Sequence, residues 1–302
     1  MRIIILFSIL LIGYSAFAQD KLVKITGTKC SLIPPAGFIV ATNFSGFQQV
    51  EKGASIMINQ LPVGYQSIVN DFTAEALKAK GMTLVSKEII DFNNSKATLI
   101  NLTQPANGTT YNKLILVFGD TKETVLVNGI YPESYKNIEE KIKTALLSTI
   151  YDASQNEDPL HAASFTIDAT GTDFKIIKYM SGSLLYSTDG KIPTVKPTLI
   201  VGNSLAAIPT QNQKEYSVER LKKLPGGELS VIKEITAVTI DNLSGFEIIA
   251  DGKSKDNKAE LIYQVMLFNS KGDYYIIVGR AKEEFEKNLA AFKKISATFK
   301  RK

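Results

Sequence analysis

The stretch Tyr111-Asn-Lys-Leu-Ile-Leu-Val-Phe-Gly-Asp-Thr-Lys-Glu-Thr-Val-Leu-Val-Asn-Gly-Ile130 decides the fold, because its pattern returns at Leu261-Ile-Tyr-Gln-Val-Met-Leu-Phe-Asn-Ser-Lys-Gly-Asp-Tyr-Tyr-Ile-Ile-Val-Gly-Arg280. Each stretch holds two runs rich in β-branched and aromatic residues around a polar turn, which predicts a β-hairpin. Gly129 and Gly279 close the two stretches at an offset of 150 residues. Runs such as Tyr274–Val278 are apolar at successive positions, which is typical of central strands covered on both faces.

The repeat extends beyond the hairpins, from Phe72 to Tyr151 and again from Tyr216 to Lys300. Each copy predicts a helix, four strands and a closing helix. Further matches keep the same order: Leu77-Lys78 with Leu221-Lys222, Lys87-Glu88-Ile89 with Lys233-Glu234-Ile235, Ser95 with Ser244, and Phe118 with Phe268. Matches in constant order at a nearly constant spacing indicate a tandem of one module.

The closing helices are predicted from apolar residues that recur at helical spacing. They are Tyr135, Ile138, Ile142, Ala145, Leu146 and Thr149 in the first copy, and Phe285, Leu289, Phe292, Ile295 and Phe299 in the second. Pro132 suits the first turn of its helix, since proline lacks the N–H that this turn leaves unpaired.

The remaining elements are read from apolar runs between glycine, proline and polar turns. In the first half we predict strands Cys30–Ile33, Phe38–Val40, Phe47–Val50 and Ser55–Asn59, then a helix Tyr65–Lys80, and then strands Met82–Asp91 and Lys96–Thr103. The second half predicts strands Ser164–Ile167, Phe174–Ile177, Leu184–Ser187 and Thr198–Val201, a helix Glu215–Lys223, and strands Leu229–Ile240 and Gly245–Ala250.

Length and composition fit two soluble domains. The chain has 302 residues, 44% hydrophobic and 22% charged, with a net charge of +5. That length allows two separate cores. We expect a first domain at 19–151, a polar linker at 152–163 and a second domain at 164–302. The weak basic excess, without a dense Lys/Arg block, argues against nucleic acid as a partner.

Residues 1–18 have the pattern of a secretory signal peptide. Arg2 supplies the positive charge, Ile3–Ile12 the apolar core, and Ala16-Phe17-Ala18 the small-residue cleavage site. Cleavage after Ala18 would export the protein to the periplasm or the medium. The apolar run is short for a membrane span, which disfavours an uncleaved anchor.

The sequence contains no recognisable catalytic, cofactor-binding or metal-binding set. Cys30 and His161 are single, which excludes an intramolecular disulfide and a zinc set, and we expect a half-buried strand thiol and a surface imidazole. Four other pairs lack the context of a functional motif: Glu139-Glu140 and Glu283-Glu284 lie beside lysines, Gly226-Gly227 lacks a phosphate-loop lysine, and Ser244-Gly245 lacks a nucleophile elbow.

Two further sets of residues have alternative interpretations. Glycosylation sequons at Asn43, Asn93, Asn101, Asn107 and Asn242 are expected by chance in an asparagine-rich chain. Phe38, Phe44 and Phe47 are predicted to line the first core, the alternative being an exposed apolar contact patch.

Each copy resembles the PsbP/Mog1-like superfamily, which includes the DcrB-like periplasmic proteins. The resemblance rests on Pro35-Ala36-Gly37-Phe38, the strand 55–59, the helix 72–77, the hairpin 113–130, and the stretch Phe285-Glu-Lys-Asn-Leu-Ala-Ala-Phe-Lys-Lys-Ile-Ser-Ala-Thr-Phe-Lys300. It covers most of 29–151 and, more loosely, 164–300. It implies an α+β fold, an antiparallel sheet flanked by helices in each copy, with a closing helix that runs into a short strand. It also implies a role in binding or assembly, without catalysis.

We therefore predict an exported, non-catalytic protein that binds an unknown protein or small molecule without a cofactor, in a groove between sheet and helix or between the domains. One alternative is a carrier of small molecules or lipids, which requires a closed apolar cavity. Another is an enzyme that uses only carboxylate, lysine and tyrosine side chains, which requires a tight cluster of them in one cleft.

Overall fold

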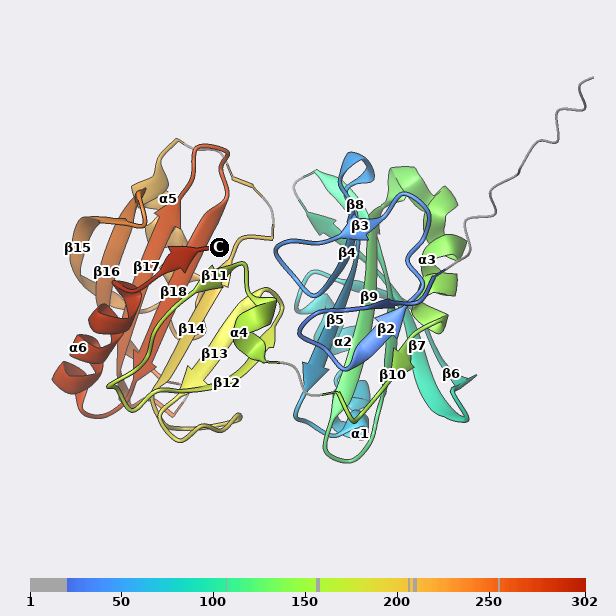
Figure 1. Cartoon of the computed structure of the whole chain (residues 1–302), viewed down its shortest axis with the longest axis horizontal. Coiled ribbons are helices and arrows are strands. Elements are labelled where there is room, and N and C mark those ends of the chain that lie inside the picture. The colour runs from blue at the N-terminus through green and yellow to red at the C-terminus, as the bar shows by residue number, and fades with distance from the viewer. Residues whose placement is uncertain (1–20, 107, 156–157, 206, 209–210, 255) are drawn as a thin grey trace, which may run out of the picture.

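The computed structural model describes residues 21–302 except 107, 156–157, 206, 209–210 and 255. The predicted signal peptide, its cleavage site after Ala18 and the sequon at Asn107 therefore lie outside the described residues. The chain forms two seven-stranded antiparallel sheets that lie side by side, each with its own helices (Figure 1). The prediction of a tandem α+β protein is confirmed.

The sheet of the first half has the strand order β3-β4-β5-β9-β8-β7-β6. Its strands are β3 (Ile39–Val40), β4 (Gly46–Gln49), β5 (Ala54–Leu61), β6 (Thr83–Phe92), β7 (Ser95–Ala106), β8 (Thr109–Gly119) and β9 (Thr124–Pro132). A small separate sheet joins β1 (Val23–Lys24), β2 (Cys30–Leu32) and β10 (Ile150–Tyr151).

The sheet of the second half has the order β12-β13-β14-β18-β17-β16-β15, so its strands follow the same path. They are β12 (Lys175–Met180), β13 (Ser183–Ser187), β14 (Thr198–Asn203), β15 (Val231–Ile240), β16 (Leu243–Lys253), β17 (Ala259–Phe268) and β18 (Tyr274–Ala281). A two-stranded sheet joins β11 (Phe165–Thr166) and β19 (Lys300–Arg301), which corresponds to the pairing of β2 with β10.

Helices cover both faces of each sheet. In the first half α3 (Glu139–Leu147) packs on one face, while α1 (Tyr65–Asn70) and α2 (Ala74–Lys78) pack on the other. In the second half α6 (Phe285–Ser296) and α5 (Gln213–Lys222) take these places. Every residue of β17 after the first is buried, as predicted for a strand covered on both faces.

Gly129 and Gly279 mark the closest approach of a helix to each sheet. A Cβ at Gly129 would lie 2.3 Å from Cγ2 of Ile142, and one at Gly279 would lie 2.6 Å from Cδ1 of Phe292. Both pairs keep the offset of 150 residues, so the glycine that ends each predicted hairpin is the contact point of the closing helix. Glycine is required there because any side chain would collide with the helix.

The hairpins β6–β7 and β15–β16 are equivalent at an offset of 148 residues. Their turns, Asn93-Asn94 and Asp241-Asn242, both have two residues at positive φ, the geometry of a type I′ turn. Both hairpins also have an irregularity in register after their second paired residue. The register corrects the predicted matches of Lys87 and Ser95, which are equivalent to Ile235 and Leu243 rather than to Lys233 and Ser244.

Three predicted segments differ from the structure. The helix predicted over 65–80 is broken, and the Thr73 side chain accepts a hydrogen bond from the N–H of Ala76 to begin α2. Pro132 ends β9 rather than entering a helix, and a 3-10 segment η2 (Glu133–Ile138) with a non-helical Tyr135 precedes α3. The predicted linker contains a short helix, α4 (Pro159–Ala162). The predicted short strands after the closing helices are confirmed.

Candidate binding cleft

The residues that stood out in the sequence do not form a site. The His161 side chain is 82% exposed, and its Nε2 lies 3.9 Å from Oδ2 of Asp158. Cys30 is fully buried in β2, and burial raises the pKa of its thiol to about 12. Phe47 is buried in the first core and Phe38 packs against it, so the prediction is confirmed for these two residues. Phe44 is also buried, but in a separate small cluster with Ala41 and Met57.

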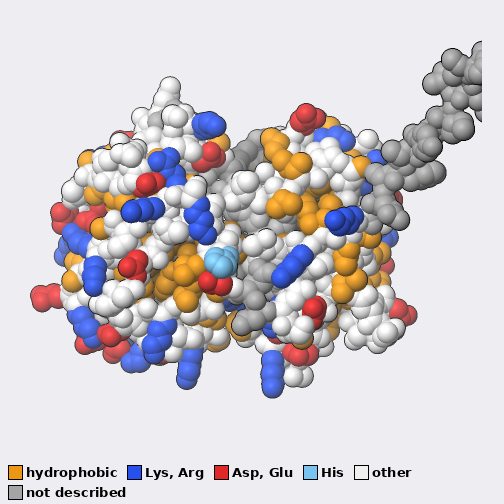
Figure 2. Space-filling model, viewed as in Figure 1, with side chains coloured by type: hydrophobic (Ala, Val, Ile, Leu, Met, Phe, Trp, Pro, Cys, Tyr) orange, Lys and Arg blue, Asp and Glu red, His pale blue; other side chains and the backbone are white. Residues whose placement is uncertain are grey.

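Glu139-Glu140 begins α3, whereas Glu283-Glu284 lies in the turn just before α6 and not, as predicted, on a helix. Glu283 and Glu284 are exposed, and Oε1 of Glu283 accepts a hydrogen bond from Lys196 Nζ at 2.9 Å. Figure 2 shows positive and negative side chains interspersed over the visible face. Within the described part of the chain, no group of histidine, cysteine and carboxylate side chains is arranged to hold a metal ion.

An open cleft of about 630 Å³ lies at one end of the first sheet. The turn β6–β7, the turn β8–β9 and strand β10 form it. Its wall contains three aromatic side chains, with ring centroids 4.9 Å apart for Phe92 and Phe118 and 6.4 Å apart for Phe118 and Tyr151. Ile150, 49% exposed, and the buried Val125 complete its apolar surface.

Two carboxylates, from Asp120 and Glu123, also line the cleft. Oδ1 of Asp120 accepts hydrogen bonds from the N–H groups of Lys122 at 2.7 Å and Glu123 at 2.8 Å. These bonds lower the pKa of Asp120, because they favour the ionised form, so the turn presents a negative charge at neutral pH. Lys96, in β7 beside the opposite turn, forms an ion pair with its cross-strand neighbour Asp91.

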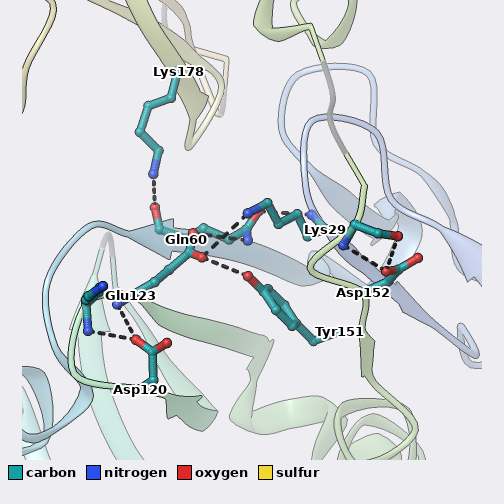
Figure 3. Close-up of polar contacts among 9 residues, drawn as sticks. Lys29, Gln60, Asp120, Glu123, Tyr151, Asp152 and Lys178 are labelled. Atoms are coloured by element: carbon teal, nitrogen blue, oxygen red, sulfur yellow. Dashed lines mark hydrogen bonds and ion pairs between the residues drawn. The ribbon is translucent and has the colours of Figure 1, made fainter.

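Glu123 is the centre of a polar network, which Figure 3 shows. The hydroxyl of Tyr151 donates to Oε2 of Glu123 at 2.8 Å, and Lys29 Nζ lies 3.9 Å from the same oxygen. Gln60 Nε2 donates to Oε1 at 3.4 Å, and Oε1 of Gln60 accepts from the N–H of Lys29 at 3.0 Å. The network holds the Tyr151 ring at the edge of the cleft.

The same network reaches the second half of the chain. Lys178 of β12 donates through Nζ to the backbone oxygen of Gln60, and burial lowers the pKa of this lysine. Glu123 lines both the cleft and a cavity of about 160 Å³ between the two halves. Further along, Ser181 donates to Oδ1 of Asn59 at 2.6 Å. Glu123 therefore lies between the cleft and the contact of the two halves.

Lys29, Glu123 and Tyr151 are the side-chain types on which an enzyme of the predicted alternative class would depend. Burial and the hydrogen bond to Glu123 raise the pKa of Tyr151, which keeps its hydroxyl protonated. Oε2 of Glu123 accepts this proton in a hydrogen bond.

None of the cleft residues was identified from the sequence. The cleft depends on which aromatic side chains lie at the end of each sheet. The two copies have the same order of strands and helices, so the order of elements does not reveal this difference between them. The signal that the sequence offers is a small residue, Val125, at a position where the second copy has the bulky Tyr275.

Comparisons with known proteins concern the fold. No protein-family model matches the chain, and a search of curated proteins finds no match. LpqN, involved in cell envelope biogenesis of Mycobacterium tuberculosis, is 21% identical over 47% of this chain and 85% of its own, with a TM-score of 0.35. PsbP from the cyanobacterium Synechocystis is 11% identical over 47% of this chain and 99% of its own, with a TM-score of 0.32.

The immunity protein TplEi of the T6SS from Pseudomonas aeruginosa extends over both halves. It is 12% identical over 93% of this chain and 97% of its own, with a TM-score of 0.32. The predicted tandem of one α+β module is confirmed by the two sheets, whose strands follow the same path. At these identities and TM-scores nothing about function passes from these proteins to this chain. Among the described residues, no helix is long and apolar enough to cross a membrane.

Proposed function

We propose that this protein is an exported, non-catalytic binding protein whose first domain takes an apolar group of a partner into the cleft beside Tyr151. The observation that carries the proposal is the cleft itself. Its volume of about 630 Å³ lies in the usual range for ligand sites. Aromatic rings with a few oriented polar groups are typical of sites that bind apolar groups with a defined orientation.

Export is part of the proposal and rests on the signal pattern of residues 1–18. The proposed domain boundaries remain those predicted, 19–151 and 164–302. The absence of catalysis is likewise part of the proposal, in which Tyr151 and Glu123 have a structural role through the hydrogen bond between them.

Site-specific photocrosslinking tests this function. Ile150 is replaced by p-benzoylphenylalanine at the edge of the cleft, and Val195, 78% exposed on the second half, provides the matched control. After irradiation of the source cells, we expect one partner crosslinked through position 150 and absent through position 195. The proposal is wrong if position 150 yields no adduct, or the same adducts as position 195.

A carrier of small molecules is the second candidate, because the volume of the cleft also suits a small aromatic compound. The cleft is open to solvent, whereas a lipid carrier needs an enclosed apolar cavity. Native mass spectrometry of the mature chain from its own host decides between the two. A bound mass of a few hundred daltons that is lost on denaturation favours the carrier, and a bound protein favours the proposed function.

A further inference from the structure

The second copy shows what fills the end of this sheet when no cleft is present. Strand registers make the two copies comparable there: Gly129 pairs with Leu114, and Gly279 pairs with Tyr263. Counting back along the strand from these glycines makes Tyr275 the counterpart of Val125. The pairing of β10 with β2 and of β19 with β11 makes Arg301 the counterpart of Tyr151.

An aromatic ring fills the space in the second copy. The Tyr275 ring lies 4.8 Å from Phe299 and 6.1 Å from Phe165, measured between centroids. Phe165 and Phe299 are themselves stacked at 5.6 Å and fully buried. The first copy has only small residues at the three equivalent positions, namely Val125, Thr149 and Cys30.

At the same end of the second sheet, the guanidinium group of Arg301 forms hydrogen bonds with a neighbouring turn. Arg301 donates through Nε to Oδ2 of Asp241 at 2.7 Å, and through Nη2 to the backbone oxygen of Asp241 at 2.8 Å. It thereby binds the turn of β15–β16. In the first copy Tyr151 turns instead to Glu123, so the equivalent turn at Asn93-Asn94 borders the open cleft.

The two copies also differ in the residue that caps the turn after the long central strand, β8–β9 in the first copy and β17–β18 in the second. Asn269 caps the β17–β18 turn through Oδ1, which accepts from the N–H groups of Lys271 at 2.9 Å and Asp273 at 3.0 Å. Asp120 makes the same kind of cap in the first copy, but with a negative charge. Throughout the described residues Asp120 has no ion-pair partner, so its charge is available to a cation from outside.

We infer that the cleft binds a segment of a partner polypeptide in which an aromatic side chain is adjacent to an arginine or lysine. The ring would occupy the space that Tyr275 fills in the second copy, and the cation would lie against Asp120. This inference rests on the proposed function and specifies the chemistry of the partner. In the second copy the chain fills this space itself with Tyr275, whereas Arg301 binds the other turn, at Asp241.

Two substitutions transfer the features of the second copy to the first. Val125→Tyr introduces the ring that fills the space, and Asp120→Asn removes the charge while its Oδ1 still accepts the two turn hydrogen bonds. Asn269→Asp is the matched control, because it adds a charge to the turn that has no cleft. Ile150→Trp, at a half-exposed position, is a second way to fill the cleft if Val125→Tyr does not fold.

The probes are N-acetylated tetrapeptide amides, Gly-Tyr-Arg-Gly and Gly-Tyr-Glu-Gly, together with tyramine and 4-ethylphenol. Binding to the mature chain is followed by amide chemical shifts of β8, β9 and β10. We expect the arginine peptide to bind more tightly than the glutamate peptide, by up to about fivefold for a solvent-exposed charge pair. Asp120→Asn should remove this difference, Asn269→Asp should leave it, and Val125→Tyr should abolish binding of both peptides.

The outcomes separate this inference from the proposed function. Equal affinity for the two peptides, or a difference that survives Asp120→Asn, overturns the basic preference while cleft binding stands. Tyramine bound as tightly as the arginine peptide overturns the polypeptide assignment in favour of a small cationic ligand. Absence of all peptide binding overturns the inference alone if position 150 still crosslinks a partner, and overturns both if it does not.

Discussion

At the scale of single residues, Gly129 and Gly279 set the distance between each sheet and its closing helix. Neither has a positive φ, so backbone conformation does not explain the choice of glycine. Contact explains it, since the nearest atoms to a built Cβ belong to Ile142 and Phe292. These positions were prominent in the sequence because they recur, and the structure gives the physical reason.

Gly279→Ala is expected to destabilise the second half by about 1–3 kcal/mol, the usual cost of adding a methyl group to a packed core. The Cβ would meet Cδ1 of Phe292 at 2.6 Å. Urea denaturation measures the change, and Phe292→Leu in the same chain provides the control because it withdraws the ring. A double variant no more stable than the sum of the two single losses would rule out this contact as the cause.

Cys30 is expected to be unreactive in the folded protein. Its side chain is fully buried, and burial raises the pKa of the thiol to about 12, whereas only the thiolate reacts. Ellman's reagent at pH 8 should therefore detect no thiol in the native protein and one thiol per chain in guanidinium chloride. Prompt labelling of the native protein would mean that β2 opens readily or is packed differently.

At the scale of helices and strands, the elements that the sequence predicted correctly are those with a clear local pattern of apolar residues. The hairpins and closing helices have apolar periodicity, and the structure has all of them.

The break between α1 and α2 was missed because the apolar spacing continues through Asp71–Thr73, whereas the cap at Thr73 begins a new helix there. The match at Lys87 was misplaced because the tripeptide Lys-Glu-Ile occurs in both copies, at 87–89 and 233–235. The paired strands are equivalent at a different offset, 148 residues. The cleft was missed because its lining residues Val125 and Tyr151 belong to two different sheets, which only the tertiary structure brings to one cavity.

The short strand β19 is attached to the second sheet by a charge pair, which predicts a pH dependence. The hydrogen bonds from Arg301 lower the pKa of Asp241 below its ordinary value of 3.8. A carboxyl whose pKa is lower in the folded state adds stability above its unfolded pKa, and that stability is lost as the pH falls through the folded pKa. The difference in unfolding free energy between the native chain and Asp241→Asn should be constant from pH 7 to pH 5 and shrink below about pH 4. Arg301→Gln should show the same disappearance, and a difference that persists at pH 2 would contradict this account.

At the scale of the whole molecule, polar contacts join the two halves while separate apolar cores stabilise each half. Asn203 donates through Nδ2 to the backbone oxygen of Asn43 at 2.9 Å, and Asn43 donates through Nδ2 to the backbone oxygen of Ser204 at 3.1 Å. The large apolar clusters contain residues of one half only. Polar contacts of this kind resemble a transient interface more than a shared core. The halves should therefore fold as separate units. The network at Glu123, which includes the bond from Lys178 to Gln60, would then contribute to their relative orientation.

Independent folding is the last prediction, and it tests the proposed domain boundaries. Fragments 19–151 and 164–302 each contain a complete seven-stranded sheet with its helices and its small accessory sheet, so each should give a dispersed amide spectrum when expressed alone. In the intact chain, Gly129→Ala should lower the thermal transition of the first half and Gly279→Ala that of the second, measured by calorimetry with each fragment as the reference. If either fragment is unfolded alone, or if both substitutions shift a single transition equally, the two halves form one cooperative unit. The contacts at Asn43 and Glu123 would then contribute to folding rather than only to the orientation of two folded domains.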